Sequence, residues 1–148
     1  DAGHSDTLPR MMGFQAAGAA PFVADAFVDN PETVASAICI GKPASWQPAK
    51  AALQFSAGAI DKVTDEEILT AYQMITAQEG IFVEPASAAA LAGIIKLQNA
   101  GKITEGSIVV ATMTGHGLKD PDNAVAHAKV EATTVEPTLD AVKAAIGI

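Results

Sequence analysis

The sequence predicts an α/β fold with three layers, in which a mostly parallel sheet is flanked by helices. Short apolar runs typical of strands alternate with longer segments of helical periodicity along the 148 residues. Almost half of the residues are apolar, but aromatic residues make up only 5% of the chain, which favours close packing of helices against a sheet. The length is sufficient for one domain with its own core.

The first elements that we expect are a strand and a helix. Residues 11–14 form a short apolar run, and the tiny residues 16–20 that follow it indicate a close approach of the backbone to another segment. A helix is predicted over 31–40, because Asn30 is a favourable cap and Pro31 suits a first helical turn.

Two more helices and a strand are expected in the middle of the chain. A helix begins near Trp46 and is closed by Gly58, and residues 59–63 then form a short strand. Thr64 and Glu67 form a capping box at the start of the next helix, whose apolar residues recur at helical spacing.

A buried helix and a buried strand are expected in the last third. The helix begins at Pro85 and ends before Gly101, and it is apolar on all sides. The strand covers 108–113. Residues 124–148 are expected to be a variable tail that ends in a helix from about Pro137. Three or four strands are few for a complete sheet, so either the domain is small or part of the sheet lies outside this chain.

Charge and composition exclude several classes of protein. The net charge is −8, which argues against nucleic acids or an anionic membrane surface as partners. Cys39 is the single cysteine, which excludes a disulfide framework and fits a cytoplasmic protein. His4, His116 and His127 have no metal-ligand spacing, so no metal site is expected.

Thr114 and Gly115 follow the predicted strand at the end where ligands bind in α/β sheets. The alternative for Thr114 is a hydroxyl that bonds to local backbone. Glu84 lies in an apolar stretch at a helix start, where it either needs a partner or caps that helix. Ala37 alone reads as a core alanine. The residues by themselves therefore predict a pocket but no reaction.

Five segments together resemble the threonine synthases, pyridoxal-phosphate enzymes of the tryptophan-synthase-β-like fold (fold type II). These are "LPRMMGFQAAGAAPFV", "NPETVASAICIGKPASW", "VTDEEILTAY", "EGIFVEPASAAALAGIIK" and "TGHGLKDPD". They occur in the family's order from Leu8 to about Asp122. Cys39 departs from the family, which usually has arginine there. The resemblance implies conversion of O-phospho-L-homoserine and water to L-threonine and phosphate, with pyridoxal 5′-phosphate as the electron sink.

The resemblance also implies which residues meet the cofactor. Thr114 matches the residue whose hydroxyl hydrogen-bonds to the pyridine nitrogen, and Gly115 lets the loop pass close to the ring. Ala37 matches a small residue that packs beside the ring, and Glu84 matches a glutamate that lines the same pocket. His116 is given no catalytic role.

The family's Schiff-base lysine and its phosphate-binding loop have no match in this sequence. We therefore expect a single domain that forms the carboxyl-terminal part of a larger two-domain enzyme and is inactive alone. Its partners would be the amino-terminal remainder and the substrate. Separation from that remainder should expose apolar surface, which favours a homo-oligomer. The alternatives are a serine or threonine dehydratase of the same fold, and a non-catalytic module that lacks the lysine by nature.

Overall fold

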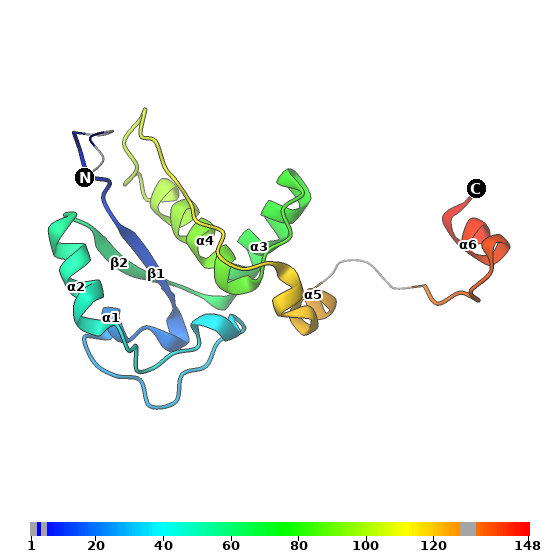
Figure 1. The fold of residues 1–148 in the computed structure, drawn as a ribbon, viewed down its shortest axis with the longest axis horizontal. Coiled ribbons are helices and arrows are strands. Elements are labelled where there is room, and N and C mark those ends of the chain that lie inside the picture. Colours follow the sequence, from blue (N-terminus) through cyan, green and yellow to red (C-terminus); the bar gives the residue numbers. More distant parts are fainter. Residues whose placement is uncertain (1–2, 4–5, 128–132) are drawn as a thin grey trace.

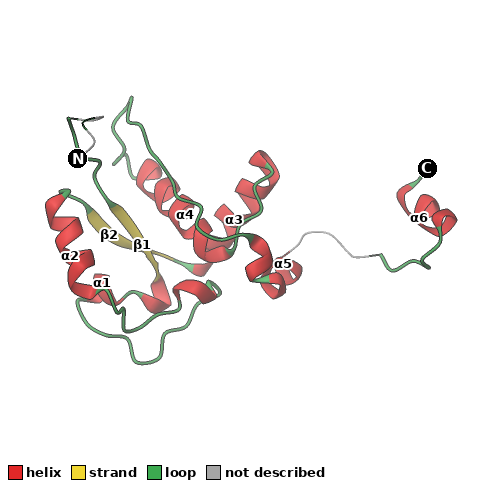
Figure 2. Cartoon of the chain, in the orientation of Figure 1, coloured by secondary structure: helices red, strands yellow, loops and turns green. Residues whose placement is uncertain are grey.

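The computed structural model describes residues 3, 6–127 and 133–148 of the chain. Figures 1 and 2 show a body of helices around a small sheet, with the last helix set apart from it. In chain order the elements are β1 (Met12–Ala16), the 3₁₀ turn η1 (Ala17–Ala19), α1 (Pro21–Ala24), the 3₁₀ turn η2 (Ser36–Ile38), α2 (Trp46–Phe55), β2 (Ala59–Val63), α3 (Asp65–Glu79), α4 (Pro85–Asn99), the 3₁₀ turn η3 (Gly117–Lys119), α5 (Pro121–His127) and α6 (Leu139–Ile146).

The sheet of the described residues consists of β1 and β2, which pair in parallel with Met12 opposite Ala59 and Ala16 opposite Val63. Parallel strands need a crossover, and here the crossover contains α1, η2 and α2. Figure 1 shows α1 and α2 on one side of the sheet and α3 and α4 on the other. The predicted α/β class with a parallel sheet flanked by helices is therefore confirmed.

The core lies where α3 and α4 meet the sheet. Ile68 and Val63 are its largest fully buried aliphatic side chains, and small alanines of α4 complete it. These alanines let α4 approach the sheet closely: a Cβ added to Gly93 would lie 2.2 Å from the Phe14 ring. Close helix-on-sheet packing follows from this small-residue face.

The capping box at the start of α3 is confirmed. The Thr64 hydroxyl accepts the Glu67 backbone N–H at 3.1 Å, and the Glu67 carboxylate accepts the Thr64 N–H at 2.7 Å. Gly80 ends the helix with a φ of 66°, a left-handed conformation that glycine adopts easily. The helices expected from Trp46 and Pro85 are also present, as α2 and α4.

The helix predicted over 31–40 is wrong, because only the short turn η2 forms there. Backbone N–H groups of this segment donate to acceptors that are distant in the sequence. The Glu32 N–H bonds to the Gly18 carbonyl, and the Val34 N–H bonds to the Asp65 carboxylate, which also accepts the Thr33 hydroxyl. These long-range hydrogen bonds replace the i to i−4 hydrogen bonds of a helix. The contact at Gly18 confirms the close backbone approach expected at residues 16–20.

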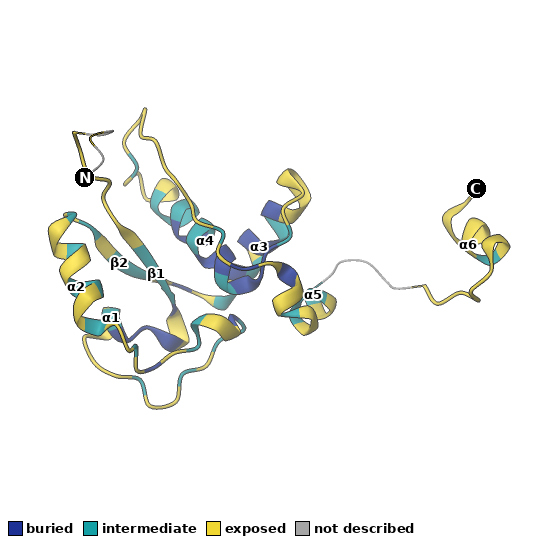
Figure 3. Ribbon diagram, viewed as in Figure 1, coloured by how far each residue is buried: buried dark blue, intermediate teal, exposed yellow. Residues whose placement is uncertain are grey.

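The buried strand predicted over 108–113 is also wrong. This segment has no ladder partner among the described residues, and most of it is exposed, with Ile108 94% and Val110 84% accessible (Figure 3). A strand requires a neighbour to bond with, so β-branched residues alone do not produce one.

The described part of the carboxyl-terminal region contains two short helices. Residues 121–127 form α5, and residues 128–132 of the expected tail lie outside the described residues. The final helix, α6, begins at Leu139, two residues after the predicted start at Pro137. Thr138 caps it by accepting the Ala141 N–H.

Candidate functional site

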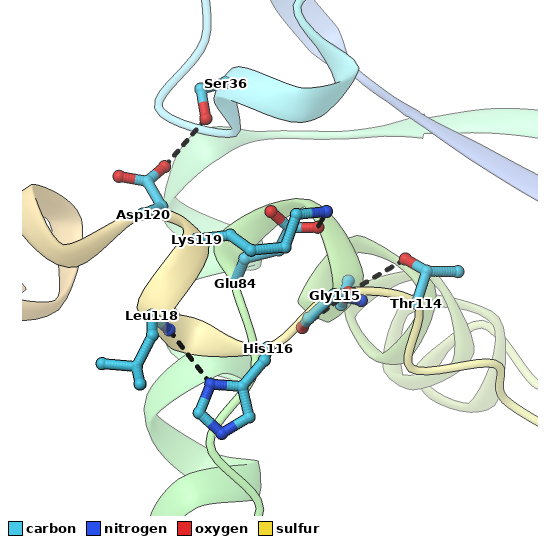
Figure 4. Close-up of polar contacts among 9 residues, drawn as sticks. Ser36, Glu84, Thr114, Gly115, His116, Leu118, Lys119 and Asp120 are labelled. Atoms are coloured by element: carbon cyan, nitrogen blue, oxygen red, sulfur yellow. Dashed lines mark hydrogen bonds and ion pairs between the residues drawn. The ribbon is translucent and has the colours of Figure 1, made fainter.

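The loop that carries Thr114 lies against the start of α4 (Figure 4). Backbone hydrogen bonds hold it there on both sides of Val83: the Glu84 N–H donates to the Gly115 carbonyl at 3.0 Å, and the Gly117 N–H donates to the Phe82 carbonyl at 3.1 Å. A bridge between Val83 and His116 lies between these bonds. The loop is therefore fixed to the segment that leads into α4.

Gly115 touches Glu84 so closely that only glycine fits. A Cβ at position 115 would lie 1.8 Å from Glu84 Oε1, well inside van der Waals contact. Glu84 is 4% exposed, and its carboxylate pairs with the Lys119 ammonium at 3.4 Å. The capping alternative for Glu84 is not borne out, because its side chain makes no cap hydrogen bond to α4. The partner that a buried carboxylate needs is Lys119.

A buried serine joins the loop to α4. Ser87 Oγ accepts the Gly115 N–H at 2.7 Å and lies 3.0 Å from Thr114 Oγ1. Ser87 is 2% exposed, whereas Thr114 is exposed. The Thr114 hydroxyl is thus held by a side chain, and the local-backbone alternative does not describe it. The sequence reasoning missed Ser87, although a lone hydroxyl within an apolar alanine run signals a need for a partner.

A second loop is tied to the same region. The Ser36 hydroxyl donates to Asp120 at 2.9 Å, and the Asn123 amide donates to Asp120 and to the Val34 carbonyl, both at 2.9 Å. The hydrogen bond from Asn123, followed by that from Ser36, lowers the pKa of Asp120 below its usual value. We call these three contacts the Asp120 latch. The latch joins the loop after Gly117 to η2, which carries Ala37.

Ala37 is exposed on η2, so its interpretation as a core alanine is wrong. The structure places Gly115 directly against Glu84, with Thr114 next to Gly115 in the chain and bonded to Ser87, whereas Ala37 is connected to them through its neighbour Ser36 and the Asp120 latch. A small side chain on an exposed turn leaves room for a ligand beside it.

Over residues 3, 6–127 and 133–148, no three His, Cys, Asp or Glu side chains gather in a way that would hold a metal ion. Within the same residues no helix has both the length and the apolar character to cross a membrane.

Residues 2–115 match the protein family described as pyridoxal-phosphate dependent enzyme. The chain belongs to this family. The match covers most of the chain, and the cofactor of the family is pyridoxal phosphate. The cofactor expectation is therefore confirmed for the family.

Several curated relatives of this chain are named threonine synthase. The chain is 57% identical over 120 residues to threonine synthase from Mycobacterium leprae, which covers 81% of this chain and 33% of the relative. It is 49% identical over 146 residues to threonine synthase from Synechocystis sp., which covers 98% of this chain and 38% of the relative. Threonine synthase from Methanosarcina acetivorans is 45% identical, over 97% of this chain and 37% of the relative. The resemblance is confirmed, and the chain spans about a third of the length of these relatives.

Solved structures of pyridoxal-phosphate-type folds align with it as well. A mutant of O-ureido-L-serine synthase with O-ureido-L-serine bound gives a TM-score of 0.62 at 13% identity, covering 94% of this chain and 39% of that one. A fungal L-serine ammonia-lyase from Rhizomucor miehei gives 0.59 at 17% identity, covering 81% and 41%. At this identity the likeness concerns the fold alone, and it confirms the tryptophan-synthase-β-like class.

The side chains of this pyridoxal-phosphate enzyme chain fit an aromatic cofactor. Thr114 is an exposed residue whose hydroxyl has a fixed partner, and Gly115 adds no side chain to the loop beside it. Ala37 is small and exposed. Ligand sites combine a few precisely placed polar groups with apolar walls, and a hydroxyl beside small residues is compatible with a planar ring that carries one polar nitrogen.

Proposed function

We propose that this chain is the carboxyl-terminal part of a threonine synthase, which converts O-phospho-L-homoserine and water to L-threonine and phosphate. The observation that carries the proposal is the 45–57% identity to threonine synthases over most of the chain, together with the Thr114 hydroxyl held by Ser87 at an exposed loop. Pyridoxal phosphate, when bound, supplies an electron sink for the carbanion that forms on the substrate.

In this proposal Thr114 is the hydrogen-bond partner of the pyridine nitrogen. A hydroxyl is neutral and can donate to an unprotonated ring nitrogen. An aspartate in the same position would stabilise the protonated ring and so strengthen its pull on electrons. Thr114 therefore sets a moderate electron demand for the reaction.

Gly115, Glu84 and Ala37 shape the space around the ring. Contact with Glu84 fixes the backbone of Gly115, so this part of the loop presents no side chain that could displace the cofactor. Pairing with Lys119 compensates the Glu84 charge and supports its burial in the pocket wall. Ala37 would pack beside the ring, where a larger side chain would displace it.

The remaining parts of the active site would come from the amino-terminal remainder of the enzyme. We propose that this remainder supplies the lysine that carries the cofactor, the phosphate-binding loop and most substrate contacts, and that this single-domain chain with its 124–148 tail is inactive alone. The fact that the chain spans about a third of its relatives supports this division. A cytoplasmic location and a homo-oligomer stay predictions.

The test is an assay of the intact enzyme with O-phospho-L-homoserine, L-serine and L-threonine as separate substrates. Release of phosphate with formation of threonine from the first substrate alone is the expected result. Turnover of serine or threonine instead would identify a dehydratase, and no turnover of any of them would favour a non-catalytic module.

Thr114→Ala should lower the turnover number while the fold persists, and an unchanged rate would contradict the role of Thr114.

A further inference from the structure

We propose that Ser87 is a positioning residue, which directs the hydroxyl proton of Thr114 toward the ring nitrogen of the cofactor. The inference rests on the function proposed above for Thr114. It arises from one contact: the Ser87 hydroxyl, buried in the first turn of α4, lies 3.0 Å from the hydroxyl of Thr114, which is an exposed residue.

The protons available at this contact define the possible arrangements. A serine hydroxyl has one proton and two lone pairs. One lone pair of Ser87 accepts the Gly115 N–H at 2.7 Å, so the hydroxyl is anchored to the loop backbone. Its own proton has two acceptors within reach, Thr114 Oγ1 at 3.0 Å and the Gly115 carbonyl at 3.3 Å.

Thr114 is the better acceptor of the two. Its oxygen lies 3.0 Å from Ser87 Oγ, against 3.3 Å for the Gly115 carbonyl, which shares its lone pairs with the Glu84 N–H. When Ser87 donates to Thr114, the Thr114 proton cannot return to Ser87. It is then free to point out of the exposed side of the loop. A hydroxyl directed in this way is ready to donate to an unprotonated nitrogen before a ligand arrives.

Packing alone does not require a serine at this position. Ala88, Ala89 and Ala92 are similarly buried on the same helix, so alanine fills other buried positions of α4. Burying a hydroxyl without a partner costs free energy, and Ser87 avoids this cost through its contacts with the loop. The hydroxyl therefore has a role beyond filling space.

The test uses the intact enzyme loaded with pyridoxal phosphate that is labelled with ¹⁵N in the ring. Ser87→Ala should move the ¹⁵N resonance of the ring in the same direction as Thr114→Ala, but by less. It should also lower kcat about fivefold, as expected for one lost neutral hydrogen bond, with little change in KM. Because Ser87 acts through Thr114, adding Ser87→Ala to Thr114→Ala should shift the resonance no further.

A matched control is Ser56→Ala. Ser56 also accepts a backbone N–H, from Met11 at 3.2 Å, and donates to the Ala52 carbonyl, but it lies outside the site. Its removal should leave the resonance and kcat unchanged. If Ser87→Ala loses the cofactor, Ser87→Cys replaces it, since a thiol is a similar shape but a weak donor and acceptor, and it should shift the resonance in the same direction.

The outcomes separate the two proposals. A resonance that moves in Thr114→Ala but not in Ser87→Ala or Ser87→Cys would overturn the positioning role and leave the proposed function standing. A further shift when Ser87→Ala is added to Thr114→Ala would also overturn it, because Ser87 would then act independently. A resonance that does not move in Thr114→Ala would remove the proposed role of Thr114 and this inference with it.

Discussion

Gly115 and Glu84 occupy the point where the loop and the start of α4 touch. The contact leaves no space for a Cβ, and it places a carboxylate that is 4% exposed directly against loop backbone. Lys119 provides the compensating charge from the same loop. Gly115 therefore allows the close approach of the two segments, and Lys119 compensates the negative charge of Glu84 at the contact.

Gly115→Ala should destabilise the protein by about 1–3 kcal/mol, the usual cost of overpacking, and lower the cofactor content of the intact enzyme. Urea unfolding and the absorbance of bound cofactor measure these effects. The control is Gly101→Ala, where a Cβ meets nothing within 4 Å but φ is +64°. That change should cost about 1 kcal/mol of backbone strain and leave cofactor content unaltered. Normal cofactor content in Gly115→Ala would show that the loop can move to accommodate the added Cβ without disturbing the cofactor site.

The Asp120 latch should lose its contribution to stability only in acid. Hydrogen bonds from Asn123 and Ser36 lower the pKa of Asp120 in the folded protein. Their stabilising effect is therefore complete above the ordinary aspartate pKa of about 3.9 and is lost as the pH falls through the lower folded-state pKa. Asp120→Asn should reduce the free energy of unfolding equally from pH 5 to 7, and the difference from wild type should shrink below about pH 4.

Urea unfolding across this pH range measures that difference. Ser36→Ala removes one donor and leaves Asn123, which makes the larger contribution to the pKa, so its effect should have the same sign and be smaller. A difference between wild type and Asp120→Asn that does not change with pH would show that the Asp120 charge has no role in the latch.

At the scale of elements, α4 connects the sheet to the site. Its amino-terminal turn holds Ser87 and receives the loop, while Gly93, further along, packs on the Phe14 ring of β1. A shift of this helix against the sheet would therefore move Ser87 as well. The fit between α4 and β1 is part of what positions the Thr114 hydroxyl.

Gly93→Ala tests this fit, because two effects oppose each other there. Alanine gains up to about 1 kcal/mol over glycine in a helix interior. The added Cβ, however, would lie 2.2 Å from the Phe14 ring, and overpacking of this kind costs about 1–3 kcal/mol. We expect net destabilisation in thermal or urea unfolding. Phe14→Leu in combination should recover part of the loss, and a more stable Gly93→Ala protein would show that α4 moves freely on β1.

Elements specified by nearby residues could be predicted from the sequence. The Thr64–Glu67 box and Pro85 at a first turn depend on contacts within a few residues, and α3 and α4 form as expected. The segment 31–40 has equally good local signals, yet Asp65 takes its Thr33 and Val34 donors from across the fold. Sequence periodicity contains no information about such a distant carboxylate.

The candidate site was predictable to the same limited extent. Thr114 and Gly115 are identified by their place after an apolar run and by the family motif, and the structure joins them to Glu84. The contacts that fix them, from Ser87 and Lys119, depend on how a loop folds back on α4 over about 30 residues of chain. That fold-back follows from tertiary packing, so these partners could not be assigned beforehand.

At the scale of the whole molecule, residues 107–113 have no strand partner among the described residues. They have the composition of a central strand, but Ile108 and Val110 are almost fully exposed. The chain spans about a third of its curated relatives, so most of the polypeptide present in those proteins is absent from it. We expect the amino-terminal remainder to provide the neighbouring strand.

Hydrogen–deuterium exchange tests this expectation. The backbone amides of residues 108–113 should exchange rapidly in the isolated chain, because they lack ladder partners, and they should be protected in the intact enzyme. The amides of the buried face of α3, around Ile68 and Ile75, serve as the control and should be protected in both proteins. Equally rapid exchange of 108–113 in both would contradict the proposed pairing.

The loop that contains Thr114 is held in place by contacts of the residues that follow Thr114 in the chain. Its anchors are the Gly115 bonds at α4 and the Asp120 latch at η2, and residues 107–113 add no ladder bond among the described residues. Peptide cleavage within 107–113 would therefore sever the covalent path from α4 to Thr114 without removing any of these anchors. The orientation of the hydroxyl is a property of noncovalent docking, and it should survive a nick in the segment that precedes it.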